Sequence, residues 1–152
     1  MNLPDDIAAA CKPLFNTLPL DQAMPHLVGS HPTHTELVNR ITQNLADRPE
    51  LIAGLWLYVD DLDRSHTVSQ SVETKTGSYW HGIMHRREGD FSNSHYWHAR
   101  AAGHPLLAER PDLDPDRLVD DVSKSSNDPA LVQRQRSEWQ ALFEWCAAQS
   151  AK

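Results

Sequence analysis

The sequence predicts a single all-α domain over residues 1–152, an irregular bundle of about six or seven helices. Apolar residues recur every three or four positions along most of the chain, which is typical of amphipathic helices. Ten prolines divide the chain into segments of helical length. A hydrophobic content of 39%, with five tryptophans, is enough to form the core of one domain of this size.

The first two helices are indicated by apolar faces and by their ends. The first covers residues 4–15, and the Pro- and Gly-rich stretch 16–32 after it is expected to be a loop. Thr33 with Glu36 predicts a capping box at the start of the second helix, which Pro49 ends. The apolar faces are formed by Ile7, Cys11 and Leu14 in the first helix and by Leu37, Ile41 and Leu45 in the second.

The segment after Pro49 allows two interpretations. Its apolar stripe consists of Ile52, Leu55, Val59 and Leu62. In the first interpretation one helix continues to about residue 72, and Asp63, His66 and Gln70 extend the same stripe as a polar half. In the second, the helix ends near Asp63 and residues 66–76 are extended.

The second half of the chain predicts four more helices. Thr76-Gly77-Ser78 is expected to be a turn that caps a helix over 79–88, and Gly89-Asp90 ends this helix. Ser92 or Asn93 is expected to cap the next helix, which runs to about Ala102. A short helix follows Pro115. The last begins with Asp128 as N-cap and Pro129 at its first position, and its apolar face contains Val132, Trp139, Leu142, Phe143 and Cys146.

Charge and composition restrict the partners and the location. A formal net charge of −7 excludes a nucleic-acid backbone as the main partner, because binding phosphates requires a basic face. There is no apolar run of membrane-spanning length and the first residues are acidic, so we expect no membrane contact and a cytoplasmic location. Cys11 and Cys146 allow a disulfide, but the missing export signal favours two buried free thiols. The oligomeric state is left open.

The segment 79–90 contains the first candidate site. On a helix His81 and His85 lie one turn apart, and Glu88 follows nearly one turn later. Two histidines in this spacing can bind a divalent metal such as zinc, iron or manganese, with a third ligand from another element, for which His66 and Asp63 are the candidates. The alternative is a solvated helix flank in which Glu88 pairs with His85 or an arginine.

Charged residues in the same segment suggest an anion site. Arg86 and Arg87 alternate with Glu88 and Asp90, and arginine forks bind carboxylates and phosphates well. One interpretation is a pocket for a small acidic ligand, to which Arg100 could add a third cation. The other, which we favour, is an internal network in which Arg86 or Arg87 holds Asp90.

Other aromatic and histidine residues are assigned mainly structural roles. Phe91, Tyr96 and Trp97 could line a pocket for a flat ligand, but core packing is the favoured role. His95 and His98 are expected on the surface, and a helix-dipole role is expected for His104. A second metal site in the Pro-rich loop would use His26, His31 and His34.

The motif from Trp80 to Trp97, W-H-x-I-M-H-R-R-E-x-D-[FY]-x-N-x-x-Y-W, resembles an uncharacterised, mainly bacterial family of hypothetical proteins. The resemblance covers roughly residues 50–105 and implies no reaction, since no activity is assigned to that family. The family pattern has no histidine at the positions of His95 and His98. It singles out one group of residues as a unit: His66, Gln70, His81, His85, Arg86, Arg87, Glu88, Asp90, Asn93 and Tyr96.

Two functional hypotheses follow. In the first, the protein is a metal-dependent or histidine-based enzyme of hydrolase type that acts on a small anionic substrate. His66, His81 and His85 bind the metal, or His81 or His85 acts as general base with Glu88 as an orienting carboxylate. Substrate contacts come from Arg86, Arg87, Asn93, Tyr96 and Gln70. In the second, the protein is a non-catalytic module that binds a ligand or a protein, and the His/Arg/Glu cluster is a structural network.

Overall fold

The computed structural model describes residues 1–150, and all regular structure in this range is helical, so the predicted all-α class is confirmed. The elements are α1 (Asp5–Thr17), α2 (Thr35–Gln43), α3 (Pro49–Tyr58), α4 (Leu62–Ser69), α5 (Lys75–Glu88), α6 (Phe91–Arg100), α7 (Pro105–Glu109), a 3-10 turn (Pro111–Leu113), α8 (Pro115–Lys124) and α9 (Pro129–Ala148). These nine α-helices of the described range exceed the six or seven predicted, because residues 49–69 form two helices and α7 was not predicted.

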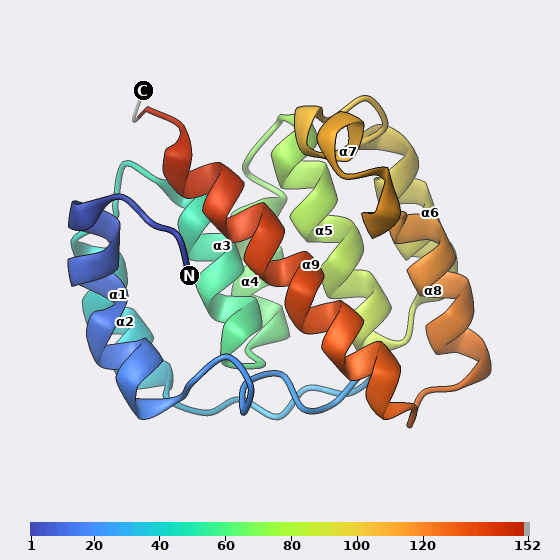
Figure 1. The fold of residues 1–152 in the computed structure, drawn as a ribbon, viewed down its shortest axis with the longest axis horizontal. Coiled ribbons are helices and arrows are strands. Elements are labelled where there is room, and N and C mark those ends of the chain that lie inside the picture. The colour runs from blue at the N-terminus through green and yellow to red at the C-terminus, as the bar shows by residue number, and fades with distance from the viewer. Residues whose placement is uncertain (151–152) are drawn as a thin grey trace.

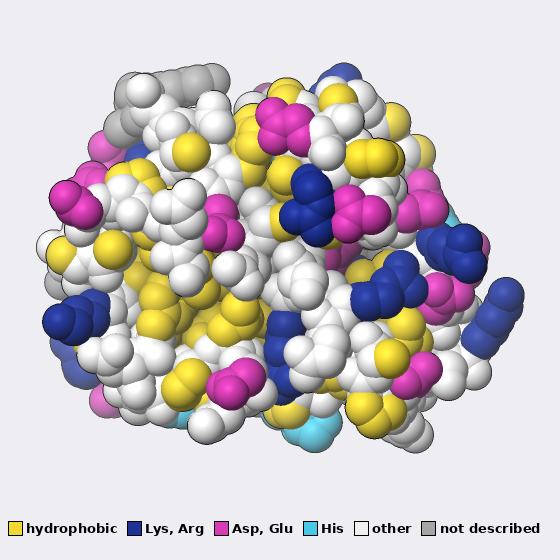
Figure 2. Space-filling model, viewed as in Figure 1, with side chains coloured by type: hydrophobic (Ala, Val, Ile, Leu, Met, Phe, Trp, Pro, Cys, Tyr) yellow, Lys and Arg dark blue, Asp and Glu magenta, His cyan; other side chains and the backbone are white. Residues whose placement is uncertain are grey.

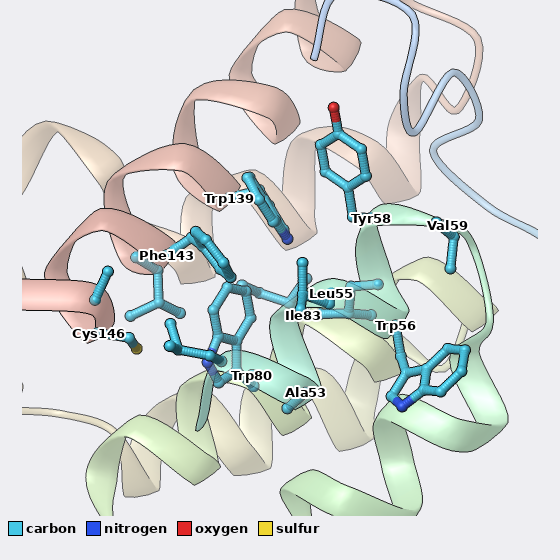
Figure 3. Packing of buried hydrophobic residues seen from close by; sticks show 14 of the residues in the cluster. Ala53, Leu55, Trp56, Tyr58, Val59, Trp80, Ile83, Trp139, Phe143 and Cys146 are labelled. Atoms are coloured by element: carbon cyan, nitrogen blue, oxygen red, sulfur yellow. The ribbon is translucent and has the colours of Figure 1, made fainter. Parts of the chain in front are cut away.

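The long helix α9 crosses one face of the molecule, with α1 and α2 on one side and α6 and α8 on the other (Figure 1). Under it lie α3 and α5, whose side chains form the core with those of α9 (Figure 3). Trp139 stacks on Phe143 with ring centroids 4.6 Å apart, and the Trp139 indole N–H donates to the Gly54 carbonyl at 2.8 Å. Trp80 of α5 is fully buried against this layer. The core therefore fixes α5 against α3 beneath α9 (Figure 1).

The chain between α3 and α4 turns sharply, and this differs from both interpretations of the 50–72 segment. Asp60 has a left-handed backbone with φ of 62°, which ends α3. Asp61 then caps α4, because its carboxylate accepts a hydrogen bond from the Arg64 backbone N–H at 3.1 Å. His66 is helical as in the first interpretation, but it lies on a separate helix with its own direction, and Gln70 is the C-cap of that helix.

The boundaries of α5 and α6 correct two predicted caps. Thr74 caps α5 by accepting a hydrogen bond from the Gly77 backbone N–H at 3.2 Å, so residues 76–78 lie inside the helix and form no turn. Asp90, in place of Ser92 or Asn93, caps α6. Gly89, with φ of 87°, ends α5 as predicted, since glycine adopts this left-handed conformation without strain.

At two further helix starts, one predicted cap is wrong and one is confirmed. The predicted capping box of α2 is wrong, because His34 occupies the N-cap without a side-chain cap and Thr33 bonds to the His34 ring. Asp128 caps α9 through the Ala130 backbone N–H at 2.9 Å, as predicted. A side-chain cap requires the loop before the helix to take the right path, and this path depends on tertiary contacts.

Charged side chains lie on the surface, and both cysteines lie in the interior. Figure 2 shows positive and negative side chains interspersed on the face that α9 crosses. Among the described helices none is long and apolar enough to cross a bilayer. Cys11 and Cys146 are both buried and free, which confirms the favoured assignment. Burial raises the pKa of the Cys11 thiol to about 12, so this thiol is protonated at neutral pH.

Helices α5 and α6 approach closely at Gly82. The ring of His98 lies against this glycine, and the Ser94 hydroxyl donates to the Gly82 carbonyl at 2.6 Å. A Cβ atom at position 82 would meet the His98 Nδ1 at 2.5 Å, which is closer than Cβ atoms approach other atoms. The absence of a side chain at Gly82 therefore makes room for His98 inside the helix pair.

We expect Gly82→Ala to lower the free energy of unfolding by about 1–3 kcal/mol because it overpacks this contact. Urea denaturation of Gly82→Ala, His98→Ala and the double variant measures the effect. The double variant should be more stable than the two single losses predict together, because removing the His98 ring relieves the clash. Strict additivity would show that the two residues do not press on each other.

Candidate functional site

Three histidines from two helices converge at one place. His81 and His85 lie one turn apart on α5, and His66 comes from α4. The ring centroids are 4.7 Å apart for His66 and His81, 5.4 Å for His66 and His85, and 4.8 Å for His81 and His85. One nitrogen atom of each ring lies within 4.8 Å of the other two. The structure thus brings together the three residues that the sequence pattern selected as metal ligands, while their binding of a metal stays a prediction.

The cluster is closed on one side and open on the other. His81 and His85 are buried, with 3% and 8% exposed, and His66 is half-buried. Trp97 of α6 stacks on the His81 ring at a centroid distance of 3.9 Å and an interplanar angle of 11°. This contact fixes the ring plane of His81. His66 is the most exposed of the three histidines, so its side of the cluster is open to a ligand.

Glu88 orients His85. The Glu88 Oε1 atom lies 2.5 Å from the His85 Nδ1 atom, three residues along the same helix. In the neutral form of the ring, a carboxylate at Nδ1 selects the tautomer with a proton on that nitrogen and leaves Nε2 with its lone pair. This is the arrangement in which a carboxylate supports a metal-binding histidine from behind. The predicted catalytic residue Glu88 is thus placed to act through His85.

The surroundings keep His81 neutral. Burial, and then the neighbouring His85 and His66, lower the pKa of His81 to about 4. Its Nδ1 atom is buried and has no hydrogen-bond partner among residues 1–150. A neutral imidazole presents a lone pair, which is the form that binds metals. Both observations favour His81 as a metal ligand over His81 as a charged surface residue.

The cluster fits a tetrahedral metal site after a small adjustment. Zinc held by imidazole nitrogens at about 2.0–2.1 Å separates these nitrogens by about 3.3 Å. The donor atoms here lie within 4.8 Å of one another, so they must come closer. His66 has the most freedom to move, because it is half-buried and makes no hydrogen bond through its ring with the described residues. Three histidines leave a fourth position for water or substrate.

Asp90 and Asn93 form a neighbouring polar group. Oxygen atoms of Glu88 and Asp90 and a nitrogen of His85 also lie within 4.8 Å of one another. The Asp90 carboxylate, however, accepts hydrogen bonds from the backbone and side-chain N–H groups of Asn93, which lower the pKa of Asp90. Asn93, predicted to contact substrate, is therefore engaged in holding the α6 cap.

Arg86 and Arg87 are placed as the favoured internal network requires, but with other partners than Asp90. Both are fully buried. Arg86 donates to Glu138 at 2.8 Å, and Arg87 donates to the Asp60 carboxylate and, at 2.6 Å, to the Leu57 carbonyl. Each guanidinium thus joins α5 to another part of the fold. The predicted substrate contact of Arg86 and Arg87 has no exposed guanidinium to support it.

Two expectations for histidines were wrong. His98, expected on the surface, is 2% exposed because α6 packs on α5 at Gly82. His104 is buried at the N-terminus of α7, where the helix dipole disfavours a positive charge, and its ring accepts a hydrogen bond from the Leu106 backbone N–H. His95 lies on the surface as expected, paired with Asp116 and Asp120.

The aromatic residues of α6 are less buried than the favoured core role requires. Tyr96 is 54% exposed, and Phe91 and Trp97 are half-buried. Gln70 is exposed beside the end of α4. The stacking of Trp97 on His81 was not predicted. The positions of the two residues could have indicated this contact. His81 and Trp97 lie on either side of the Gly89-Asp90 turn, so they meet when α5 and α6 pack against each other as a hairpin.

Two cavities stand out in residues 1–150, and the histidine cluster lines neither of them. The first, about 190 Å³, includes Tyr58, Asp60, His26, His31 and His34 in its wall. Its three histidines are the second metal site considered for the Pro-rich loop, but they are not among the groups of described residues close enough to share an ion. The second cavity, about 220 Å³, lies beside Glu138 and is lined by Arg110, Asp112, Leu113, Leu118, Arg134 and Ser137.

Comparison with known proteins adds no further assignment: no family model, no curated protein and no solved structure matches this chain. The resemblance of the segment from Trp80 to Trp97 to an uncharacterised family thus stays a prediction.

The buried ion pair between Arg86 and Glu138 generates a stability prediction. Arg86→Met should lower the free energy of unfolding by about 3–5 kcal/mol, because it leaves the Glu138 carboxylate buried without a cation, with only the Tyr79 hydroxyl as a side-chain donor among residues 1–150. Adding Glu138→Leu should recover much of this loss in urea denaturation. Arg117→Met is the control, since Arg117 is exposed and its loss should cost less than about 0.5 kcal/mol. A small effect of Arg86→Met would contradict a structural role.

Buried histidines also predict a dependence of stability on pH. Burial is the main cause that lowers the pKa of His98 to about 3 and of His104 to about 4. The unfolded chain takes up these protons below its pKa of about 6.5, whereas the folded protein does not. The contribution of these two histidines to the free energy of unfolding should therefore be constant above about pH 6.5 and fall as the pH decreases, by about 1.4 kcal/mol per pH unit and proton.

His98→Phe tests this directly, because it removes one of these protons and keeps a ring of similar size. Urea denaturation between pH 7.5 and 5 should show a smaller loss of stability on acidification for this variant than for the unmodified protein. His31→Phe, at an exposed position, should leave the slope unchanged. An unchanged slope in His98→Phe would show that His98 takes up its proton without unfolding.

Proposed function

We propose that the protein is a divalent-metal-dependent enzyme of hydrolase type, with His66, His81 and His85 as the metal ligands. The observation that supports it most is the convergence of three imidazole nitrogens from two helices within 4.8 Å. Such a group is costly without a ligand, because one of its nitrogens is buried without a hydrogen-bond partner among residues 1–150. A metal ion would satisfy these nitrogens.

The donor set suits this chemistry. Three imidazoles favour zinc, with iron and manganese as further candidates, and leave one coordination position open. A divalent ion in such a site supplies Lewis acidity and lowers the pKa of a bound water towards neutrality. The low pKa of His81 keeps this ligand unprotonated at neutral pH. Glu88 fixes the His85 ring with its Nε2 atom directed away from the carboxylate.

The position of the cluster favours a small substrate. The three histidines lie outside both cavities described above and are accessible from the side of His66. A substrate would therefore contact the open metal position and the surface of α4 and α6, without entering a deep pocket. A cytoplasmic location is part of the proposal, since reducing compartments keep thiols such as Cys11 and Cys146 free.

A second candidate is a non-catalytic module in which the histidines serve the scaffold. The observation that favours it is the stacking of Trp97 on His81, which joins α5 and α6 without any ligand. Under this alternative the protein binds a small ligand or another protein elsewhere, for example at the cavity lined by His26, His31 and His34. The two candidates differ in whether the purified protein binds a metal.

We expect about one equivalent of zinc, iron or manganese in tag-free protein measured by elemental analysis. His81→Ala and His85→Ala should lose the metal. Glu88→Gln should keep the stoichiometry but weaken the affinity by about 10–100-fold, because it removes the carboxylate behind His85. His95→Ala is the matched control, since His95 is a surface histidine with two carboxylate partners and should leave metal binding unchanged.

Circular dichroism of each variant shows whether it is folded. Folded protein without metal, before and after incubation with zinc, cobalt or manganese, would overturn the proposed function and favour the scaffold role. If metal is bound, hydrolysis of a panel of small esters, amides and phosphate esters by the wild type and His81→Ala tests the reaction class.

A further inference from the structure

The proposed site lacks an obvious group to bind an anionic substrate, because Arg86 and Arg87 are buried in ion pairs. Arg100, at the end of α6, is an exposed cation one helical turn after Trp97, the residue that stacks on His81. Its guanidinium makes no hydrogen bond and no ion pair with any of residues 1–150. Its free N–H groups are available to a ligand.

Aromatic contacts connect Arg100 to His81 through Trp97. The Arg100 Cζ atom lies over the Trp97 ring at 5.3 Å from its centroid and over the Tyr96 ring at 5.8 Å. The same Trp97 ring stacks on His81. Arg100 is thus connected to a proposed metal ligand through a single side chain. A guanidinium that packs on aromatic rings keeps its N–H edges free, and these edges match the oxygens of a carboxylate or phosphate.

Tyr96 adds an apolar surface to this cation. It is 54% exposed, and among the described residues only Met1 is another large hydrophobic side chain with comparable exposure. An exposed aromatic ring beside an unpaired arginine suits a ligand that combines an anionic group with an apolar part.

We propose that Arg100 and Tyr96 form the substrate-binding surface of the site, and that they bind a small organic oxyanion such as an aryl or alkyl phosphate or carboxylate. The oxyanion contacts the guanidinium of Arg100, and the apolar part packs on Tyr96. This inference rests on the proposed function, because it assigns the binding surface to a substrate of the metal site held by His66, His81 and His85, to which Arg100 is joined through Trp97. It assigns to Arg100 the role first expected of Arg86 and Arg87.

Arg64 offers a matched control within the same chain. Like Arg100 it is exposed and packs on a tryptophan, with its Cζ atom 4.9 Å from the Trp56 ring centroid. Unlike Arg100 it is paired, since the Asp61 carboxylate lies 3.2 Å from its Nη1 atom. A loss of positive charge in general would affect both variants, whereas loss of a binding group would affect only Arg100.

The test uses the full-length protein with cobalt added. Binding of phenyl phosphate, benzoate and inorganic phosphate is measured by calorimetry and by the visible absorption of cobalt. The wild type should bind phenyl phosphate or benzoate more tightly than inorganic phosphate. Arg100→Gln should weaken binding at least about tenfold, as loss of a charged hydrogen bond does. Arg100→Lys should retain part of the affinity, and Tyr96→Ala should remove the preference for the aryl ligand. Arg64→Gln should bind as the wild type does.

The outcomes separate this inference from the proposed function. If Arg100→Gln binds cobalt and its affinity for the oxyanion is unchanged, the inference is overturned, whereas the proposed metal site is still supported. If no cobalt binds, the proposed function fails, and calorimetry on the same protein then tests the binding surface alone. Binding of phenyl phosphate or benzoate that depends on Arg100 supports the surface. Absence of such binding overturns the inference. Preference between these two ligands shows which oxyanion the surface takes.

Discussion

The buried ion pair between Arg87 and Asp60 is the constraint on which the arrangement of the site depends. Arg87 lies at the end of α5, and Asp60 lies in the turn between α3 and α4. Both are buried, and a buried charge must be paired because its removal from water is costly. The pair therefore holds the turn against α5. Because this turn sets the direction of α4, it also determines that His66 lies opposite His81 and His85.

Helix α5 contributes both to the scaffold and to the candidate site, through different sides of the same helix. One side carries Trp80, Ile83 and Met84 into the core, where Trp80 packs under α9 (Figure 3). Another carries Arg86 to Glu138 of α9. With these contacts made, the remaining arc of His81 and His85 is directed to α4 and α6. The precision that a metal site requires can thus come from a rigid, fully packed helix.

The histidines of this protein are divided among different physical environments. His81 is buried beside two other imidazoles and an aromatic ring, which favours the neutral form. His98 fills the space left by Gly82 and acts as a packing group. His95 lies between two carboxylates on the surface, and the hydrogen bond with Asp116 raises its pKa. Nine histidines in one chain therefore do not indicate one function, and only the neighbours of each ring distinguish a ligand from a scaffold residue.

The sequence by itself determined the helical class, the end of α5 at Gly89, the start of α9 at Asp128-Pro129 and the pairing of His81 with His85 on one arc, because helical periodicity and local capping depend on neighbouring residues. The sequence also selected His66 as a candidate ligand, although it did so from one predicted helix to about residue 72, which the structure replaces by α3 and α4. Only the tertiary structure decided the break at Asp60, the partners of Arg86 and Arg87, the burial of His98 and the contact of Trp97 with His81. These features join residues from separate helices, and their energies come from burial and charge pairing, which local sequence patterns do not contain.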